Sequence, residues 1–599
     1  MTCRSIARNQ AAARLFAAAL AAVCLLWPIP AAGAAGRGPS SPAGESAIPS
    51  ISPGGPADIV VRPEFSRRSR TNHGYVEYGF VIRNLSARHP HRVRLTLPDT
   101  YYGGYGLRVS RSAVVEPGGT VALSLFQLPV GVRGHGVQVL VDGDAGESVE
   151  AALADHDPSY GSYSRDDRYN VLISRSARAP VSDLEAAKEI SVTVAPQGDA
   201  AWSSHWLAYS RYDGVIVTPA DLARMAGPVR SALERYVECG GTVLVVGPYE
   251  PVSGFCGMEG TGGAPVRRTG FGTCLTAASW SEGDVASRFT NSLRATYGAV
   301  AEPVSVVQAH KVLPVVANLS IPVRGMLLLM LGFVVLIGPV NLILLRRFRR
   351  RLLLFVTTPA VSLLTCSALF GYALFSEGVH ARYRLATLTV LDEGQTRATS
   401  LGWLGYYSPL ASRQALRFSY QTELTPQCGG SGPTGGSGGL GVDWTEGQDL
   451  TGGWIRARTP LHFQVRKSER RRERLKLRRG PDGLAVVNGL GAPVERLTLV
   501  DFNGEVFAAA DVAPGAEAGL AARPGKPQGW DLRRIYAKNW ILAVQTLADR
   551  PLTHLKPGTY VAVLDGNPFV EHGLADARPH ECLTVVYGYL ERGDDAGPR

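Results

Sequence analysis

The sequence is poor in cysteine, with eight in 599 residues, and it has neither a Cys-x-x-Cys pair nor a cluster among its twelve histidines. Structural zinc sites need ligands grouped at such spacings. We therefore expect no metal site, and nothing in the sequence indicates a cofactor. The composition is otherwise that of a folded protein, with 45% hydrophobic and 19% charged residues.

Acidic residues are missing from the first 34 positions, which carry Arg4, Arg8 and Arg14. The chain has a net charge of +11, and five more arginines lie between Arg346 and Arg351. These two short segments account for most of the positive excess. A chain that binds nucleic acid would instead spread basic residues over its folded surface. We therefore exclude nucleic acid as a partner.

The N-terminus has the pattern of a secretory signal peptide. Arginines precede an apolar stretch from Leu15 to Trp27, and the small residues Ala32-Gly33-Ala34 follow. We predict that residues 1–34 are removed on export. The alternative is a retained anchor, which the short apolar stretch disfavours. Residues 35–57 are rich in Gly, Pro, Ser and Ala, and we predict a flexible linker there.

Two long uncharged segments, 325–345 and 352–376, lie on either side of the densest charge. At ~1.5 Å per residue the first would span about 31 Å as a helix, close to the ~30 Å of a bilayer core. Arginine is retained on the cytoplasmic side of a membrane. We therefore predict two transmembrane helices, with both flanks outside the cytoplasm and a cytoplasmic turn at 346–351 that contains Arg346, Arg347, Arg349, Arg350 and Arg351. The alternative is a pair of buried helices in a soluble protein.

The exported N-terminal part has two kinds of pattern. Over 58–145, short alternating segments such as YVEYGFVIRNL and HRVRLTLP are separated by turns, which predicts an immunoglobulin-like β-sandwich. Over 165–300, the apolar strands YNVLIS, ISVTVA, YDGVIVT and TVLVVG alternate with helical segments. That alternation predicts a doubly wound parallel sheet.

The stretches YDGVIVTPADLARM and VRSALERYVECGGTVLVVGP resemble the flavodoxin-like domain of the class I glutamine-amidotransferase-like superfamily. Active members carry a cysteine in a Gly-x-Cys-x-Gly turn after a strand, together with a His and an acid. The corresponding turn here reads Gly247-Pro248-Tyr249-Glu250. Covalent catalysis needs an activated nucleophile beside a base. The resemblance therefore implies the fold without the activity, and we expect no catalytic residues.

A binding role remains for this domain. Ligands of open α/β sheets lie outside the carboxyl ends of the strands, where the sequence places Arg175, Ser176, Thr218, Gly247 and Tyr249. We take these as candidates for a ligand crevice; the alternative is that they are ordinary loop residues. An exported compartment permits disulfides. Cys256 and Cys274 are the candidate pair because they are close in sequence, which alone leaves the connectivity open.

Strand patterns return over 377–599, with a Gly- and Ser-rich loop at 429–441 that we predict to be flexible. One or two β-sandwich modules fit this region. The basic run VRKSERRRERLKLRR, residues 465–479, could form a patch for anionic lipid or polysaccharide. We favour the solvated face of a β-hairpin, because Leu475 and Leu477 alternate and Gly480-Pro481-Asp482-Gly483 forms a turn.

The segment IGPVNLILLRRFRRRLLLFVTTPAVSLLTCSALFGYAL is similar to the membrane segment of a family of uncharacterised bacterial envelope proteins. Those proteins combine an exported amidotransferase-like domain with a Gly-Pro-Val-Asn helix and a basic turn. The expected architecture is multidomain α/β plus all-β: a β-sandwich, a flavodoxin-like domain, a two-helix transmembrane hairpin and C-terminal β-sandwich modules. We expect a non-catalytic platform in the bacterial cytoplasmic membrane that binds envelope proteins or senses a ligand. The alternatives are an envelope hydrolase or amidotransferase, and a glycan-binding protein that uses aromatics in TYYGGYG or GWLGYYS.

Overall fold

The computed structural model of the chain describes residues 58–66, 73–97, 100–102, 105–128, 131–132, 136–145, 149–150, 169–177, 190–195, 202–247, 255–257, 266–280, 284–296, 305–316, 323–347, 354–377, 380–412, 414–427, 440–480, 483–523 and 555–591. Some predictions fall elsewhere. The signal peptide 1–34, the linker 35–57, Tyr249, the three arginines at 349–351 and residues 429–439 lie outside the described ranges.

Two antiparallel layers form the N-terminal region. One is a sheet in the order β1 (Ile59–Ser66), β2 (Val76–Asn84) and β6 (Thr120–Gln127). The centre of the other is β8 (Gly136–Val141), β3 (His91–Thr96) and β5 (Tyr105–Val115), with the short strands β4 (Thr100–Tyr102), β7 (Gly131–Val132), β9 (Asp144–Ala145) and β10 (Val149–Glu150). Apolar residues that alternate along these strands, such as Phe80, Leu95 and Leu125, share one core. This arrangement fits the predicted β-sandwich.

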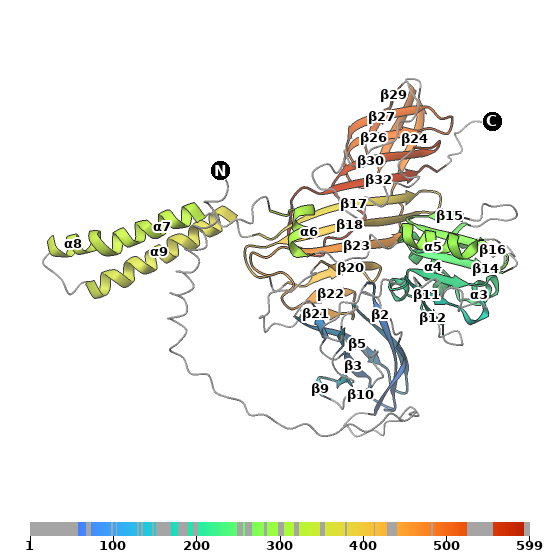
Figure 1. The fold of residues 1–599 in the computed structure, drawn as a ribbon, viewed down its shortest axis with the longest axis horizontal. Helices are drawn as coiled ribbons and strands as arrows, with labels where there is room; N and C mark the ends of the chain where they lie inside the picture. The colour runs from blue at the N-terminus through green and yellow to red at the C-terminus, as the bar shows by residue number, and fades with distance from the viewer. Residues whose placement is uncertain are drawn as a thin grey trace. The chain divides into compact units, whose positions relative to one another are not determined.

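The second layer is larger than the sequence indicated, because strands from far along the chain extend it. β21 (Leu440–Asp443) pairs in parallel with β5 in the register Leu440↔Leu107 to Asp443↔Ser110. β22 (Gln448–Thr451) and β19 (Leu416–Phe418) continue the sheet (Figure 1). The first two residues of β21 belong to the predicted flexible loop, so that loop ends earlier than we predicted. Four strands of this sheet, β10, β19, β21 and β22, therefore lie outside the predicted range 58–145.

The α/β domain has the predicted doubly wound form. Its strands are β11 (Tyr169–Ile173), β12 (Ile190–Val194), β13 (Gly214–Val217), β14 (Thr242–Val246), β15 (Val266–Thr269) and β16 (Gly272–Ala277), in the order β12-β11-β13-β14-β16-β15. All neighbours are parallel except β15 and β16. Side chains on one face of the sheet pack in the core that contains α4 (Gly227–Glu238), and those on the other face pack with α5 (Val285–Thr296).

Local sequence explains how the helices of this domain begin. Thr218 caps α3 (Pro219–Arg224): its hydroxyl accepts a hydrogen bond from the Asp221 amide, and the Asp221 carboxylate bonds back to the Thr218 amide. Proline follows at the first helical position, where its missing N–H costs nothing. The apolar face of α4, which contains Val229 and Leu233, is buried.

Helices form over the predicted hairpin. α7 (Val323–Val335), a π-helical turn η6 (Leu336–Val340) and α8 (Asn341–Arg347) follow one another directly, and α9 (Leu354–Glu377) runs back beside them (Figure 1). Pro339 lies in the π-helical turn, because its ring excludes the normal backbone bond. Among the residues that the structure describes, no helix combines the length and the apolar character that crossing a membrane requires. The membrane-spanning part of our prediction is therefore not confirmed.

The C-terminal region is dominated by one long sheet (Figure 1). Its main order is β20 (Thr422–Pro426), β23 (Leu461–Arg470), β18 (Arg397–Tyr407), β17 (Arg382–Asp392), β32 (Leu583–Tyr589), β30 (Thr559–Asp565), β26 (Val494–Val500), β27 (Val506–Val512) and β29 (Ala521–Ala522), with β31 (Arg578–Pro579) beside β17. A second sheet, β24 (Arg474–Gly480), β25 (Gly483–Gly489) and β28 (Glu517–Gly519), shares a core with it. The predicted hairpin in the basic run is β24–β25, with Gly480 opposite Gly483.

The residues on the two sides of the hairpin are joined at its base. Residues 313–316 follow α6 (Val306–Val312) and come before the hairpin, whereas Arg384 and His462 come after it. Arg384 donates to the carbonyl of Pro314 at 2.6 Å, and His462 Nε2 lies 2.9 Å from the carbonyl of Leu313. The chain thus leaves one folded region where the hairpin begins and returns to the same region where the hairpin ends.

Candidate functional site

The strand order of the α/β domain places its switch point between β11 and β13. The chain leaves β11 for β12 on one side, and β13 lies on the other side. Ligands of doubly wound sheets bind outside the carboxyl ends of the strands at such a point. Residues 174–176 follow β11, with η2 (Arg175–Ala177) as a single turn, and Thr218 follows β13. We therefore build the candidate site from these two ends.

Three of the residues around this point are hydroxyl-bearing and lie in contact. The Ser176 hydroxyl is 2.9 Å from that of Ser174 and 3.4 Å from that of Thr218. Ser176 and Thr218 both donate to Asp221 Oδ2, at 2.5 Å and 2.7 Å. Two predicted residues, Ser176 and Thr218, are therefore brought together. Asp221, which our prediction did not include as a site residue, is the group that joins them.

The Asp221 carboxylate is held in its ionised form. Burial alone would raise its pKa, but hydrogen bonds from Ser176, Ser174 and Thr218 outweigh burial and lower the pKa. Its other oxygen accepts a bond from Arg224 at 3.0 Å. Because both oxygens already accept bonds and the group caps α3, Asp221 organises the edge of the crevice. It is not placed to take a proton from a substrate.

The other predicted crevice residues are less closely placed. Arg175 is exposed on η2, beside Ser176. Gly247 ends β14 with φ +142°, and its amide donates to the carbonyl of Ala277 at 2.9 Å. A side chain at Gly247 would have a Cβ 3.1 Å from the Pro219 ring, so glycine suits this close approach. Tyr249 lies outside the described residues. Of the predicted crevice residues, Ser176 and Thr218 are thus in contact, and Gly247 lies close to Pro219, the residue after Thr218.

None of the described cysteines of this domain is an activated nucleophile. Burial raises the pKa of Cys239, and a hydrogen bond with Cys274 together with burial raises that of Cys256. A catalytic thiol needs a lowered pKa and access to solvent. Both thiols are almost fully buried. Cys239 and Cys256 are therefore not placed to act as nucleophiles in acyl transfer.

A second polar cluster lies where the α/β domain meets the long sheet, and the sequence did not reveal it. We predicted a solvated basic run from residue 465, but Arg466, Lys467 and Ser468 on β23 are buried. Arg466 pairs with Glu423 at 2.6 Å and donates to the carbonyl of Cys239 at 3.4 Å. Ser468 donates to Glu238 of α4. Arg466 and Ser468 are interface groups and Lys467 is buried as well, so the prediction of a solvated face was wrong for this part of the run.

Arg397 strengthens the same interface from β18. One of its nitrogens lies 3.0 Å from each oxygen of Glu238, and the other pairs with Glu234 at 3.2 Å. Burial tends to raise the pKa of Glu238 more than Arg397 and Ser468 lower it. An ion pair buried to this degree stabilises only when both partners are present. The α/β domain, which precedes the hairpin, is thereby tied to the sheet that follows it.

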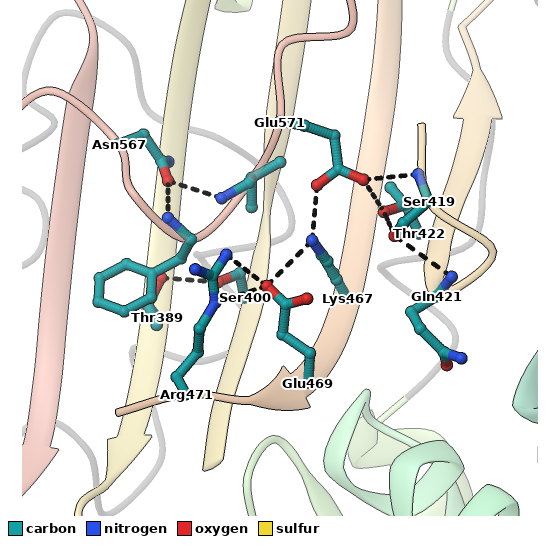
Figure 2. A network of polar contacts seen from close by, with 12 residues as sticks. Thr389, Ser400, Ser419, Gln421, Thr422, Lys467, Glu469, Arg471, Asn567 and Glu571 are labelled. Atoms are coloured by element: carbon teal, nitrogen blue, oxygen red, sulfur yellow. Dashed lines mark hydrogen bonds and ion pairs between the residues drawn. The ribbon is translucent and has the colours of Figure 1, made fainter. Parts of the chain in front are cut away.

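The opposite face of β23 carries a separate network, shown in Figure 2. Lys467 lies between Glu571 at 2.6 Å and Glu469 at 3.0 Å. Glu571 also accepts bonds from the Ser419 amide at 2.8 Å and the Thr422 hydroxyl at 2.6 Å. Burial would raise the pKa of Glu571, but Lys467 and these donors lower it to about 2. The network joins β20, β23 and the segment at 571, so its role is structural.

Aromatic residues fill the contact between the N-terminal sheets and later parts of the chain. Trp444 Nε1 donates to the carbonyl of Phe126 at 2.8 Å, and the Tyr75 hydroxyl donates to that of Leu424 at 3.0 Å. Trp403, Tyr406 and Tyr407 of the GWLGYYS segment are buried in cores. That segment cannot supply an open sugar-stacking surface, which removes it from the glycan-binding alternative. The side chains of TYYGGYG lie outside the described residues.

Comparisons with known proteins add no identification. No protein-family model matches the chain, and no curated protein matches its sequence.

Proposed function

We propose that the chain is a non-catalytic, membrane-anchored platform of the cell envelope, with all of its sheets on one side of the membrane. One observation supports this most strongly: residues before and after the helical hairpin fold together. β5 and β21 share a sheet, and Glu238 pairs with Arg397. A hairpin that starts and ends in one folded body has both ends on the same side of whatever covers it.

The surface of the hairpin supports a hydrocarbon environment. Large apolar side chains on both helices are exposed, Leu328 at 72%, Phe355 at 79% and Leu363 at 71% among them. Soluble proteins rarely expose contiguous apolar surface of this kind, which marks contact with a membrane or a partner. α7, η6 and α8 together give one uninterrupted helical run from Val323 to Arg347. We propose that this run and α9 are inserted together.

The charge at one end of the hairpin sets the proposed orientation. Arg346 and Arg347 end α8 and are exposed, next to the basic turn. Because basic loops are retained in the cytoplasm, we propose that the turn faces inward and the sheets face outward. The signal peptide predicted for residues 1–34 would export the N-terminal flank independently of the hairpin.

The crevice of the α/β domain supports a binding role and not a catalytic one. Its hydroxyls are anchored by Asp221, and the described residues around it include no imidazole that could activate Ser176. Nucleophilic catalysis requires such a base. We propose that a small polar ligand or a protein loop binds at the exposed edge formed by Arg175 and Ser176.

The orientation can be tested by thiol labelling in intact cells. Cys366, Cys428 and Cys582 are replaced by serine. One cysteine at a time is then introduced by Ala226→Cys before the hairpin, Ala510→Cys after it or Arg347→Cys at the turn, and all three positions are exposed. A membrane-impermeant maleimide should label the first two in intact cells and the third only after lysis. Shielding of either flank in intact cells would overturn the proposal.

Two further measurements test the remaining parts of the proposal. The chain should remain in the membrane pellet after a carbonate wash. Release by the wash would mean that a protein partner, and not lipid, covers the hairpin. The purified chain should not hydrolyse amide or ester substrates, and turnover abolished by Ser176→Ala would show that the crevice is catalytic.

A further inference from the structure

Two buried cysteines from separate segments lie against each other in the α/β domain. Cys274 is on β16, whose neighbour β14 places Val243 opposite it. Cys256 is in η5 (Phe255–Gly257), which belongs to the connection between β14 and β15. Both thiols are free in the structure and hydrogen-bonded to one another, and the two residues are 5% and 1% exposed. This contact brings together the pair that the sequence singled out.

The backbone at Cys256 supplies a second, independent observation. Its φ is +51°, in the left-handed region that residues with a Cβ rarely adopt. Such a conformation is strained and persists only where the surroundings impose it. In this conformation the Cys256 thiol contacts Cys274 of β16. Cys239 lies in the same core, but its thiol interacts with charged groups such as Arg466 and Glu238.

We propose that Cys256 and Cys274 are joined by a disulfide in the exported protein, which fastens η5 to β16 beside the candidate crevice. The inference rests on the proposed location of the sheets outside the cytoplasm, where disulfides persist. The connection that contains η5 starts at Gly247, and the Gly247 amide is bonded to Ala277 at the end of β16.

The bond forms by exchange with a thiol–disulfide oxidoreductase of the envelope. The Cys256 thiolate attacks the disulfide of that carrier, forms a mixed disulfide and displaces one carrier thiolate. The Cys274 thiolate then attacks the Cys256 sulfur and releases the second carrier thiolate. The carrier leaves as a dithiol, which carries away the two electrons and the two protons of the cysteine thiols. Because both thiols are buried in the finished fold, we expect exchange before η5 packs on β16.

The test is to map the linkage in the full chain. Cells are quenched with acid, free thiols are blocked with N-ethylmaleimide, and the purified chain is digested without reduction by trypsin and chymotrypsin. Cleavage after Arg267 separates Cys274 from Cys256, and cleavage after Tyr249 separates Cys256 from Cys239. Mass spectrometry should find the Cys256 and Cys274 peptides linked in most of the protein. Cys239→Ser, a matched buried control, should leave that link intact, whereas Cys274→Ser should abolish it.

A second arm keeps this inference separate from the proposed orientation. The purified, reduced chain is unfolded in urea and refolded in a glutathione redox buffer, which should give the same link. If no link forms there or in cells, the inference is overturned. The inference is also overturned if thiol labelling shows that the sheets lie outside the cytoplasm, but the link forms only during refolding in the glutathione buffer and not in cells. If the link forms only with glutathione and the sheets prove cytoplasmic, the pairing is supported and the proposed function fails.

Discussion

The network in Figure 2 predicts a specific dependence of stability on pH. Glu571 has its pKa lowered from 4.5 to about 2, and its side chain is 26% exposed. At ~1.4 kcal/mol per pKa unit, the ionised form contributes about 3 kcal/mol to folding. Because the pKa of the folded state lies below that of the unfolded state, this stabilisation is fully present above pH 4.5. It is lost as the pH falls towards 2.

The substitution Glu571→Gln removes this contribution and keeps the shape of the side chain. We expect the free energy of opening around β23 to fall by about 3 kcal/mol at pH 7, which is roughly a hundredfold loss of amide protection. Hydrogen exchange of the β23 amides measures it. The matched control is Glu591→Gln, because Glu591 pairs with Arg474 at the surface and should contribute no more than about 1 kcal/mol.

The two proteins should become alike in acid. Because the pKa of Glu571 is about 2, the wild-type carboxyl is protonated below pH 2, and there the exchange of wild type and Glu571→Gln should coincide. Equal amide protection in wild type and Glu571→Gln at pH 7 would show that the Lys467–Glu571 pair does not stabilise the fold. A difference that persists unchanged below pH 2 would show that packing, and not charge, is responsible.

Three further substitutions or conditions have expected outcomes. Glu238→Ala leaves Arg397 without its main buried partner and should lower the free energy of opening of α4 by about 3 kcal/mol, measured by hydrogen exchange. The control Arg224→Ala removes an exposed arginine and should lower the same free energy by less than about 1 kcal/mol. Burial raises the pKa of Glu393 to about 7, so its contribution to stability is complete below about pH 4.5 and is lost as the pH rises through 7. The urea midpoint of unfolding should therefore be lower at pH 8 than at pH 5. Glu393→Gln should remove this dependence of the midpoint on pH. Gly272→Ala places a Cβ 1.9 Å from the Val237 carbonyl and should prevent folding, whereas Gly227→Ala meets nothing within 4 Å and should be tolerated, as judged by the yield of folded chain.

Local patterns predicted the α/β domain well. The four strands named from the sequence occur where expected, because continuous apolar runs are buried on both faces of a parallel sheet. Thr218 caps its helix, and such a cap can be predicted from sequence because it depends on a few adjacent residues. Two of the crevice residues, Ser176 and Thr218, could be found for the same reason: both directly follow a strand. The role of Asp221 could have been found from its position three residues after Thr218.

Pairing over long distances along the chain could not be predicted in this way. β21 joins β5 across more than three hundred residues, and its local alternation does not name a partner. Ser468 and Glu238 are 230 residues apart, and Lys467 and Glu571 are 104 apart. A basic run is solvated in the absence of acidic partners. Only the fold brings these partners to β23, which explains why we misjudged the burial of Arg466 and Lys467.

The pairing of β5 with β21 tests the central claim most directly, because it requires both flanks of the hairpin to lie together outside the cytoplasm. Ser110 Oγ and Asp443 Oδ2 are 3.5 Å apart, so the double variant Ser110→Cys, Asp443→Cys can form a disulfide. A membrane-impermeant oxidant applied to intact cells should cross-link the two introduced cysteines. When the chain is then cleaved at a protease site inserted between β20 and β21, the two fragments should stay joined on a denaturing, non-reducing gel. The shifted pair Arg111→Cys, Asp443→Cys should give separate fragments. Separate fragments from the first pair in intact cells would contradict the account.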